Sequence, residues 1–190
     1  QGGKAIARIL FGEKNPEGKL PVTFYRSTEE LPEFTDYSMK GRTYRYMEQD
    51  ALYPFGYGLS YTDFTFSDAK ASSDVIDENG VDIKVTVANT GSMEGTETVQ
   101  AYVKVLPEQE VSNIPNVQLK GIAKCLLKPG EKKEVCLHLP IEAFSLYDEE
   151  GKCMVYKGNY HVHIGGQGPA ARSSFLTGKK VLDMKFHVKQ

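Results

Sequence analysis

From residue 62 onward, short runs of the chain alternate apolar and polar residues, and each such run predicts a β-strand. The clearest run is residues 81–87, Val-Asp-Ile-Lys-Val-Thr-Val, in which every second residue is apolar and would face inward. Runs of the same kind cover residues 63–67, 98–106, 118–127, 134–139, 153–156, 159–164 and 181–188. Turn formers separate the runs, most clearly Lys-Pro-Gly-Glu at 128–131. About seven short strands joined by turns at regular spacing predict a β-sandwich.

The beginning of the chain has a different pattern. Residues 4–11 favour a helix with Ile6, Ile9 and Leu10 on one face, and the glycine that follows would end it. Residues 20–24, Leu-Pro-Val-Thr-Phe, predict a short strand, whose proline suits a sheet edge or a strand start. One helix and one strand cannot enclose a core, so this part must pack against the rest of the chain or against another body.

Residues 26–50 are rich in turn formers, which predicts an irregular segment. Within it, residues 41–47, Gly-Arg-Thr-Tyr-Arg-Tyr-Met, alternate in a way that favours a strand. Such a strand would place Tyr44 and Tyr46 on one side and Arg45 on the other.

The next segment, residues 52–61, reads Leu-Tyr-Pro-Phe-Gly-Tyr-Gly-Leu-Ser-Tyr. It is too apolar for a free loop, and its glycines and proline interrupt any helix or strand. Glycine permits a close approach of two backbones, and aromatic rings fill the space between two surfaces. The segment is therefore predicted to be a buried connector between two bodies.

Several segments resemble, in order, the C-terminal region of family 3 glycoside hydrolases, the β-glucosidase and β-xylosidase group. Residues 12–24, Gly-Glu-Lys-Asn-Pro-Glu-Gly-Lys-Leu-Pro-Val-Thr-Phe, match that family's G-x-x-N-P-S-G-K-L-P-V-T-F segment, with Glu17 in place of the usual serine. The other matching segments are residues 41–47, the connector at 52–61, Val-Ala-Asn-Thr-Gly at 87–91, Leu-Lys-Gly at 119–121, Leu-Lys-Pro-Gly-Glu at 127–131 and Phe-Ser-Leu-Tyr-Asp at 144–148. No single motif decides the matter, but their shared order makes the resemblance specific.

The resemblance implies three regions. Residues 1–25 would be the end of an α/β sandwich domain, residues 26–61 the connector, and residues 62–190 a fibronectin type III-like β-sandwich. The fold class expected is therefore mainly β, with a helix–strand remnant and a long connector before the sandwich. The catalytic domains of the same enzyme would be the partner of this chain.

The resemblance also implies the chemistry of the larger enzyme, which would hydrolyse terminal β-linked glucose or xylose with retention. One carboxylate attacks the anomeric carbon, while a second protonates the leaving oxygen and later activates water. Both carboxylates would lie before Gln1, so no catalytic residue is assigned here and the chain alone is expected to be inactive. No cofactor is expected.

Four residues are candidates for substrate contact, namely Arg42, Tyr44, Arg45 and Tyr46. Aromatic faces stack on sugar rings, and guanidinium groups donate hydrogen bonds to hydroxyl groups. The alternative is structural: the tyrosines would pack at the domain boundary while Arg45 pairs with a carboxylate of the missing body. Both interpretations stay open at this point.

Neither a metal site nor a phosphate loop is predicted. The pair Cys136 and His138 and the pair His161 and His163 each share a strand face, and four such ligands could hold zinc if the strands were neighbours. The apolar residues that alternate with them are expected to face the core in both strands, however, so the four side chains would point toward solvent. Gly-Gly-Gln-Gly at 165–168 follows a strand, and no helical pattern comes after it.

Composition limits the other partners. The net charge is −2, and no basic stripe is present, which argues against a nucleic-acid partner. No apolar run is long enough to predict a membrane span. Three cysteines, an odd number, favour free thiols and a cytoplasmic protein, although a Cys125–Cys136 bridge and a secreted parent stay open. A homo-oligomer is also left open. The competing hypothesis is a stand-alone β-sandwich module that binds carbohydrate or protein.

Overall fold

The structure is a computed structural model that describes residues 1–148 and 150–188. Its helices are α1 (Gly2–Leu10), α2 (Thr43–Tyr46) and α3 (Ala171–Thr177), with 3₁₀ turns η1 (Thr28–Glu30) and η2 (Ile141–Phe144). Its strands are β1 (Phe64–Ala71), β2 (Val75–Ile76), β3 (Val81–Asn89), β4 (Gly95–Pro107), β5 (Gln118–Leu127), β6 (Lys132–Leu139), β7 (Leu146–Tyr147), β8 (Cys153–Met154), β9 (Gly158–Gly165) and β10 (Leu182–Val188).

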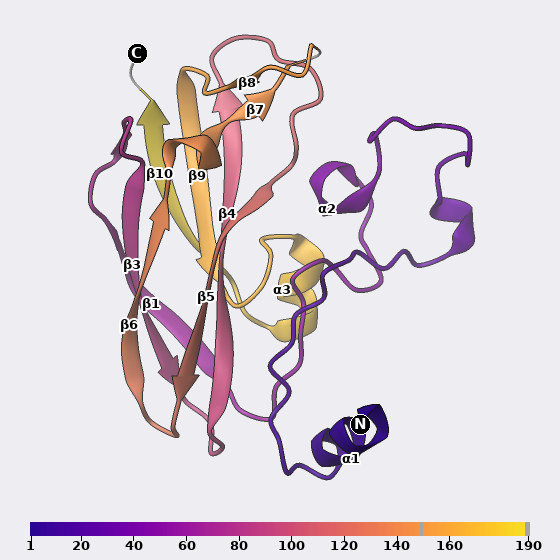
Figure 1. The fold of residues 1–190 in the computed structure, drawn as a ribbon, viewed down its shortest axis with the longest axis vertical. Helices are drawn as coiled ribbons and strands as arrows, with labels where there is room; N and C mark the ends of the chain where they lie inside the picture. The colour runs from indigo at the N-terminus through magenta and orange to yellow at the C-terminus, as the bar shows by residue number, and fades with distance from the viewer. Residues whose placement is uncertain (149, 189–190) are drawn as a thin grey trace.

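The strands form the predicted β-sandwich. One sheet has three strands in the order β1-β3-β6, and the other has five in the order β2-β10-β9-β4-β5. Neighbouring strands are antiparallel, except that β2 runs parallel to β10. A small β7-β8 ladder closes one end, while α1 and α2 lie to the side of the sandwich (Figure 1).

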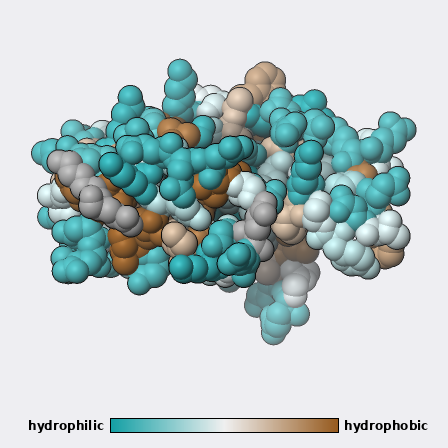
Figure 2. All heavy atoms as spheres, turned by 90° about the horizontal axis from the view of Figure 1, so that it is seen from above, coloured by the Kyte–Doolittle hydropathy of each residue, from teal (hydrophilic) through white to brown (hydrophobic). Residues whose placement is uncertain are grey.

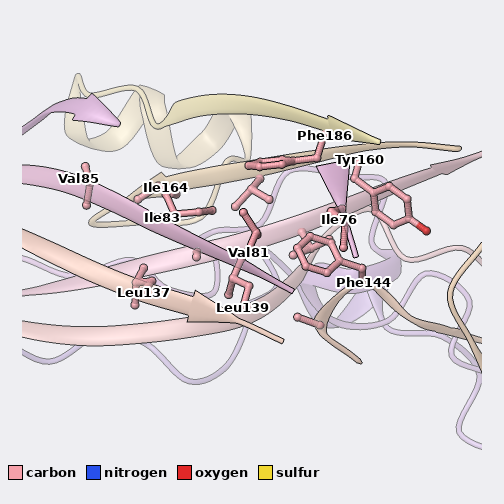
Figure 3. Packing of buried hydrophobic residues seen from close by; sticks show 14 of the residues in the cluster. Ile76, Val81, Ile83, Val85, Leu137, Leu139, Phe144, Tyr160, Ile164 and Phe186 are labelled. Carbon is pink, nitrogen blue, oxygen red and sulfur yellow. The ribbon is translucent and has the colours of Figure 1, made fainter. Parts of the chain in front are cut away.

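The core lies between the two larger sheets, as the alternating pattern requires. The inward residues of β3 are all buried, which confirms the prediction for residues 81–87. Phe144 from η2 contacts Tyr160 from β9 edge-on, with ring centroids 5.7 Å apart (Figure 3). Burial raises the pKa of Tyr160 to about 12, and its hydroxyl donates a hydrogen bond to the Tyr156 carbonyl. The end of the molecule seen in Figure 2 is mostly hydrophilic, with hydrophobic atoms visible between the polar side chains.

Asn89, in the Val-Ala-Asn-Thr-Gly motif, shows why that turn needs an amide side chain. The side chain is buried and donates from Nδ2 to the carbonyls of Met93 at 2.8 Å and Leu127 at 3.0 Å. Its Oδ1 accepts from the Thr62 hydroxyl at 2.6 Å and from the Gly91 amide at 3.1 Å. One amide therefore joins the start of the sandwich to the ends of β3 and β5.

The predicted strand at 41–47 is wrong, because the structure has the helical turn α2 there. The Thr43 carbonyl accepts from the Met47 amide at 2.9 Å, and the Thr43 hydroxyl accepts from the Arg45 amide at 3.3 Å. Contacts with β5 then hold the turn in place, since the Tyr44 hydroxyl accepts from the Leu119 amide at 3.0 Å. Local hydrogen bonds and docking override the alternating pattern.

Two further expectations need correction. A helix, α3, does follow the glycine-rich sequence at 165–168, although the sequence showed no helical pattern there. The strand expected at 20–24 is reduced to a single β-bridge between Phe24 and Tyr53. In the part of the chain that the structure describes, no helix has the length and apolar character needed to cross a membrane.

We expect Asn89→Asp to destabilise the chain by about 3 kcal/mol, because it removes two donors from buried carbonyls and adds a buried charge. The measurement is urea unfolding followed by far-UV circular dichroism. Asn79→Asp, in an exposed turn, is the matched control and should change stability little. An equal effect of the two substitutions would contradict the role of Asn89.

Candidate interdomain interface

The connector pairs with residues 20–24 through backbone hydrogen bonds. The Leu20 amide donates to the Tyr57 carbonyl and the Gly56 amide donates to the Leu20 carbonyl, both at 2.8 Å. Further along, the Phe24 amide donates to the Tyr53 carbonyl at 2.9 Å. The two segments therefore run antiparallel as one ribbon, which lies beside the sandwich (Figure 1).

Three aromatic rings fix this ribbon to the outer face of the five-stranded sheet. Phe55 of the connector stacks on Tyr44 of α2, with ring centroids 4.1 Å apart and planes 13° apart. Both rings meet Tyr102 of β4 edge-on, at 6.4 Å and 6.1 Å. Tyr102 points away from the core but is fully buried by these rings, and burial raises its pKa above the ordinary tyrosine value. We call this contact between the connector and β4 the seam.

Gln100, one pleat away from Tyr102 on β4, supplies the polar part of the seam. Its Nε2 donates to the carbonyls of Gly56 and Gly166, both at 3.0 Å, and its Oε1 accepts from the Tyr102 hydroxyl at 2.6 Å. Gly56 has φ +78°, and an added Cβ would lie 2.2 Å from the Tyr102 hydroxyl oxygen. Only glycine satisfies both the backbone conformation and the close approach at this position.

A shielded ion pair links residues 12–20 to the same strand. Lys19 Nζ lies 2.8 Å from Glu97 Oε1, and their side chains are only 17% and 9% exposed. Glu97 also accepts a hydrogen bond from the Thr98 amide at 2.8 Å. Removing one partner would leave a charge with little access to water, so the pair favours this one arrangement of the two segments.

Asn15, in the Asn-Pro-Glu-Gly turn, holds the end of the connector. Its Oδ1 accepts from the Tyr61 amide at 2.7 Å, and its Nδ2 donates to the Ser60 hydroxyl at 3.1 Å. The Tyr61 hydroxyl in turn donates to the Ile9 carbonyl at 2.9 Å, which ties α1 to the connector. The motif residue thus joins segments that are far apart in sequence.

The predicted burial of the connector is only partly realised within this chain. Pro54 and Gly56 are buried, whereas other apolar residues of the N-terminal region remain exposed. No residue of α1 is buried within the described chain, although the helix has an apolar face. The exposed large apolar residues of this region are Ile6, Leu10, Phe11, Val22, Phe24, Leu31, Phe34, Tyr37, Met39, Leu52, Tyr53, Leu59 and Tyr61. We call this set the outward apolar face.

The four residues predicted to contact substrate lie together but have different surroundings. Tyr44 belongs to the seam, as described above. Arg42 donates to three carbonyls of its own loop. Arg45 Nη2 donates to Gln118 Oε1 at 3.2 Å, and its carbonyl accepts from the Asn116 amide. The half-buried Tyr46 makes no side-chain hydrogen bond with the residues that the structure describes.

Arg45 shares its surroundings with a second cation. Burial, and then the charge of Arg45, lower the pKa of the half-buried Lys120 on β5. Within residues 1–148 and 150–188, neither cation forms an ion pair with a carboxylate. This corner of the interface is therefore electrostatically complementary to an acidic group.

The histidine and cysteine pairs considered as zinc ligands lie on different sheets, β6 and β9, and do not converge. His161 and His163 instead share Asp183 on β10, with Nδ1–Oδ1 distances of 2.9 and 3.3 Å. Burial lowers the pKa of His163, an effect that Asp183 opposes and that His161 and Lys104 reinforce. As far as the described residues show, the three cysteines are free and no group of three or more ligands could hold a metal.

Comparison with known proteins assigns the N-terminal region and part of the sandwich to two known domain families. Residues 1–61 match the family model of the glycosyl hydrolase family 3 C-terminal domain, and residues 97–167 match that of the fibronectin type III-like domain. The chain belongs to family 3 of the glycoside hydrolases. It corresponds to their C-terminal portion, which confirms the resemblance and the fold class expected from the motifs.

Individual relatives agree with this family 3 assignment. The chain is 42% identical over 166 residues to the xylan 1,4-β-xylosidase of Xylanibacter ruminicola, covering 87% of this chain and 19% of that protein. It is 40% identical over 178 residues to the periplasmic β-glucosidase of Salmonella typhimurium, covering 87% and 23%. The β-glucosidase structure from Erythrobacter marinus superposes with a TM-score of 0.78 at 33% identity, covering all of this chain and 24% of that one. The chain therefore spans about a fifth of the length of these relatives.

The family 3 chain also has seam residues that the sequence patterns did not single out. Gln100 and Tyr102 occupy outward positions of a strand, where polar residues are ordinary. The signal available was a large aromatic residue on the solvent side of an otherwise regular strand. That signal shows that something covers the strand, but it does not identify the covering segment.

We expect Gly56→Ala to loosen the seam, because the new methyl group would overlap Tyr102 and Gln100. The cost should be about 3 kcal/mol, and limited proteolysis should release residues 1–61 faster than in the unmodified chain. Gly12→Ala is the matched control: it has a similar φ of +74° but open space around the added Cβ. The control should lose only about 1 kcal/mol, and equal losses would show that the contact with Tyr102 is unimportant.

Proposed function

We propose that this chain is the C-terminal structural part of a retaining, exo-acting β-glycosidase that hydrolyses terminal β-linked glucose or xylose. The family assignment and the names of the relatives support this class of reaction. The observation that carries the structural role is the outward apolar face, which the sandwich leaves uncovered. So many exposed large apolar side chains in one region are typical of a protein contact rather than of free solvent.

In this proposal the upstream part of the polypeptide supplies both catalytic carboxylates. Retaining hydrolysis needs two carboxyl groups about 5 Å apart on either side of the scissile bond. Two of the carboxylates described above are engaged otherwise, with Glu97 bound to Lys19 and Asp183 shared by two histidines. No acidic residue of the chain matches the family's catalytic motifs.

The structural role follows from how the ribbon is held. One side of it is fixed to the rigid sandwich by the seam, the Lys19–Glu97 ion pair and Asn15. The other side carries the outward apolar face toward the catalytic domains. A catalytic domain supported in this way keeps its reacting groups in a narrower range of positions, which favours catalysis.

A substrate role for Arg42, Tyr44, Arg45 and Tyr46 remains a prediction. The Arg42 guanidinium and the Tyr44 hydroxyl are engaged within the chain, which supports the structural alternative for both. Arg45 has one side-chain partner, Gln118, and no carboxylate in the described residues. We therefore propose that Arg45 and Lys120 face an acidic side chain of the catalytic domains.

The structural role is tested by placing serine on the apolar face of α1. In the full-length enzyme, Ile6→Ser and Leu10→Ser should each destabilise the protein by about 2 kcal/mol, because each removes a buried aliphatic side chain from the domain contact. The measurement is the midpoint of urea unfolding. Lys4→Ser on the same helix is the control. Substitutions without effect would show that the helix faces solvent in the whole enzyme.

Arg45→Ala in the full-length enzyme separates the two roles of Arg45. An interdomain ion pair predicts a lower melting temperature, with KM and kcat for an aryl β-glycoside nearly unchanged. Loss of a partly shielded ion pair should cost about 1–3 kcal/mol. A raised KM at an unchanged melting temperature would assign Arg45 to the substrate instead.

A further inference from the structure

The loop of residues 31–42 has little secondary structure, yet side-chain hydrogen bonds hold it in one shape. Arg42 Nε donates to the Ser38 carbonyl at 2.9 Å, and Nη2 donates to the carbonyls of Glu33, at 3.3 Å, and Asp36. The planar guanidinium thus binds three backbone carbonyls of the loop at once. We call this segment the Arg42 loop.

Asp36 forms further hydrogen bonds within the same loop. Its Oδ1 accepts from the Ser38 amide at 2.8 Å and its Oδ2 accepts from the Ser38 hydroxyl at 3.1 Å. The backbone hydrogen bond, followed by the hydroxyl hydrogen bond, lowers the pKa of Asp36. The hydrogen bonds therefore favour the charged carboxylate and engage both of its oxygens.

The shape of the Arg42 loop presents two aromatic rings outward. Phe34 is 92% exposed and Tyr37 is 89% exposed, the highest values among the large apolar side chains of the described residues. Leu31 and Met39 flank them and are about half exposed. These side chains border an open hollow of ≈ 650 Å³. Because side-chain hydrogen bonds already fix the loop, little conformational entropy would be lost when its rings bind a partner.

The chemistry of the loop favours a protein surface over a sugar. A sugar site needs free donors and acceptors beside its aromatic rings. Here the side chains of Arg42 and Asp36 already bind the loop itself. Leu31 and Met39 are exposed beside the two rings, so apolar side chains form a large part of the surface that the loop displays. An apolar centre of this kind is typical of a residue cluster that is buried in a protein–protein contact.

The occupant follows from where the loop lies in the chain. The Arg42 loop lies within the segment that leaves the ribbon after Phe24 and returns to it at Leu52, and its exposed side chains belong to the outward apolar face. The chain spans only about a fifth of the length of its relatives, and in the proposed function the upstream part of the polypeptide lies against this face. We propose that the Arg42 loop is a preformed plug whose Phe34 and Tyr37 insert into the upstream part of the same polypeptide. This inference rests on the proposed function.

Hydroxyl-radical footprinting of the full-length enzyme tests the plug without any substitution. Tyr147 of β7, 68% exposed, lies at the far end of the sandwich from α1 and serves as the reference (Figure 1). Tyr37 is the more exposed of the two in this chain, but in the whole enzyme it should be labelled about tenfold more slowly than Tyr147, because docking excludes water from it. Phe34 should be protected in the same way.

Each other outcome of the footprinting would overturn the plug. Equal labelling of Tyr37 and Tyr147 would show a free loop. Protection that appears only when glucose is added would assign the rings to sugar, and protection that disappears on dilution would assign them to a second copy of the protein. Tyr53 reports on the proposed function separately: if Tyr53 is protected while Tyr37 is open, the plug fails and the structural role stands.

A variant pair provides an independent measurement. Phe34→Ser combined with Tyr37→Ser should lower the melting temperature of the full-length enzyme by about 3 °C or more, whereas Tyr147→Ser should change it little. A raised KM with an unchanged melting temperature would contradict docking and indicate contact with substrate.

Discussion

Tyr102 lies on the outer face of a sheet and is nevertheless fully buried, because the rings of Phe55 and Tyr44 cover it. The position of the N-terminal region depends on this contact. Gln100 completes it by donating to the backbone carbonyls of Gly56 and Gly166. Each aromatic pair contributes about 0.5–1.5 kcal/mol beyond the burial of its area, so the two pairs that involve Tyr102 strengthen the attachment, and the stacking of Phe55 on Tyr44 holds the two covering rings together.

The attachment makes the two sides of the N-terminal region unequal. Toward the sandwich, several polar groups are paired: Lys19 with Glu97, Asn15 with the end of the connector, and the backbone of the ribbon with itself. Elsewhere in the N-terminal region, apolar groups of α1 and of the Arg42 loop are exposed. A stable protein seldom displays such a face, since covering apolar surface is the main favourable contribution to folding. This difference between an attached part and an exposed apolar part is consistent with a structural role and with a large protein partner.

Prediction from the sequence was most accurate where a local pattern has one physical solution. Alternation in residues 81–87 admits a single inward face, and β3 buries that face as expected. The predicted helix at 4–11 appears as α1, because helix propensity and the terminating glycine agree. By contrast, α2 replaced an expected strand, since the hydroxyl of Tyr44 finds its partner on β5, a strand that begins far along the sequence. The short helix α3 was missed because no apolar periodicity marks it.

The sequence by itself determined the β-sandwich, the family and the presence of a connector rich in rings and glycines. These follow from periodicity and from motifs whose residues act locally or in fixed order. Only the tertiary structure decided which residues the connector covers, and that Arg42 organises its own loop while Tyr44 joins the seam. Such choices depend on contacts between segments that are distant in sequence, and a burial pattern records that a side chain is covered without recording what covers it.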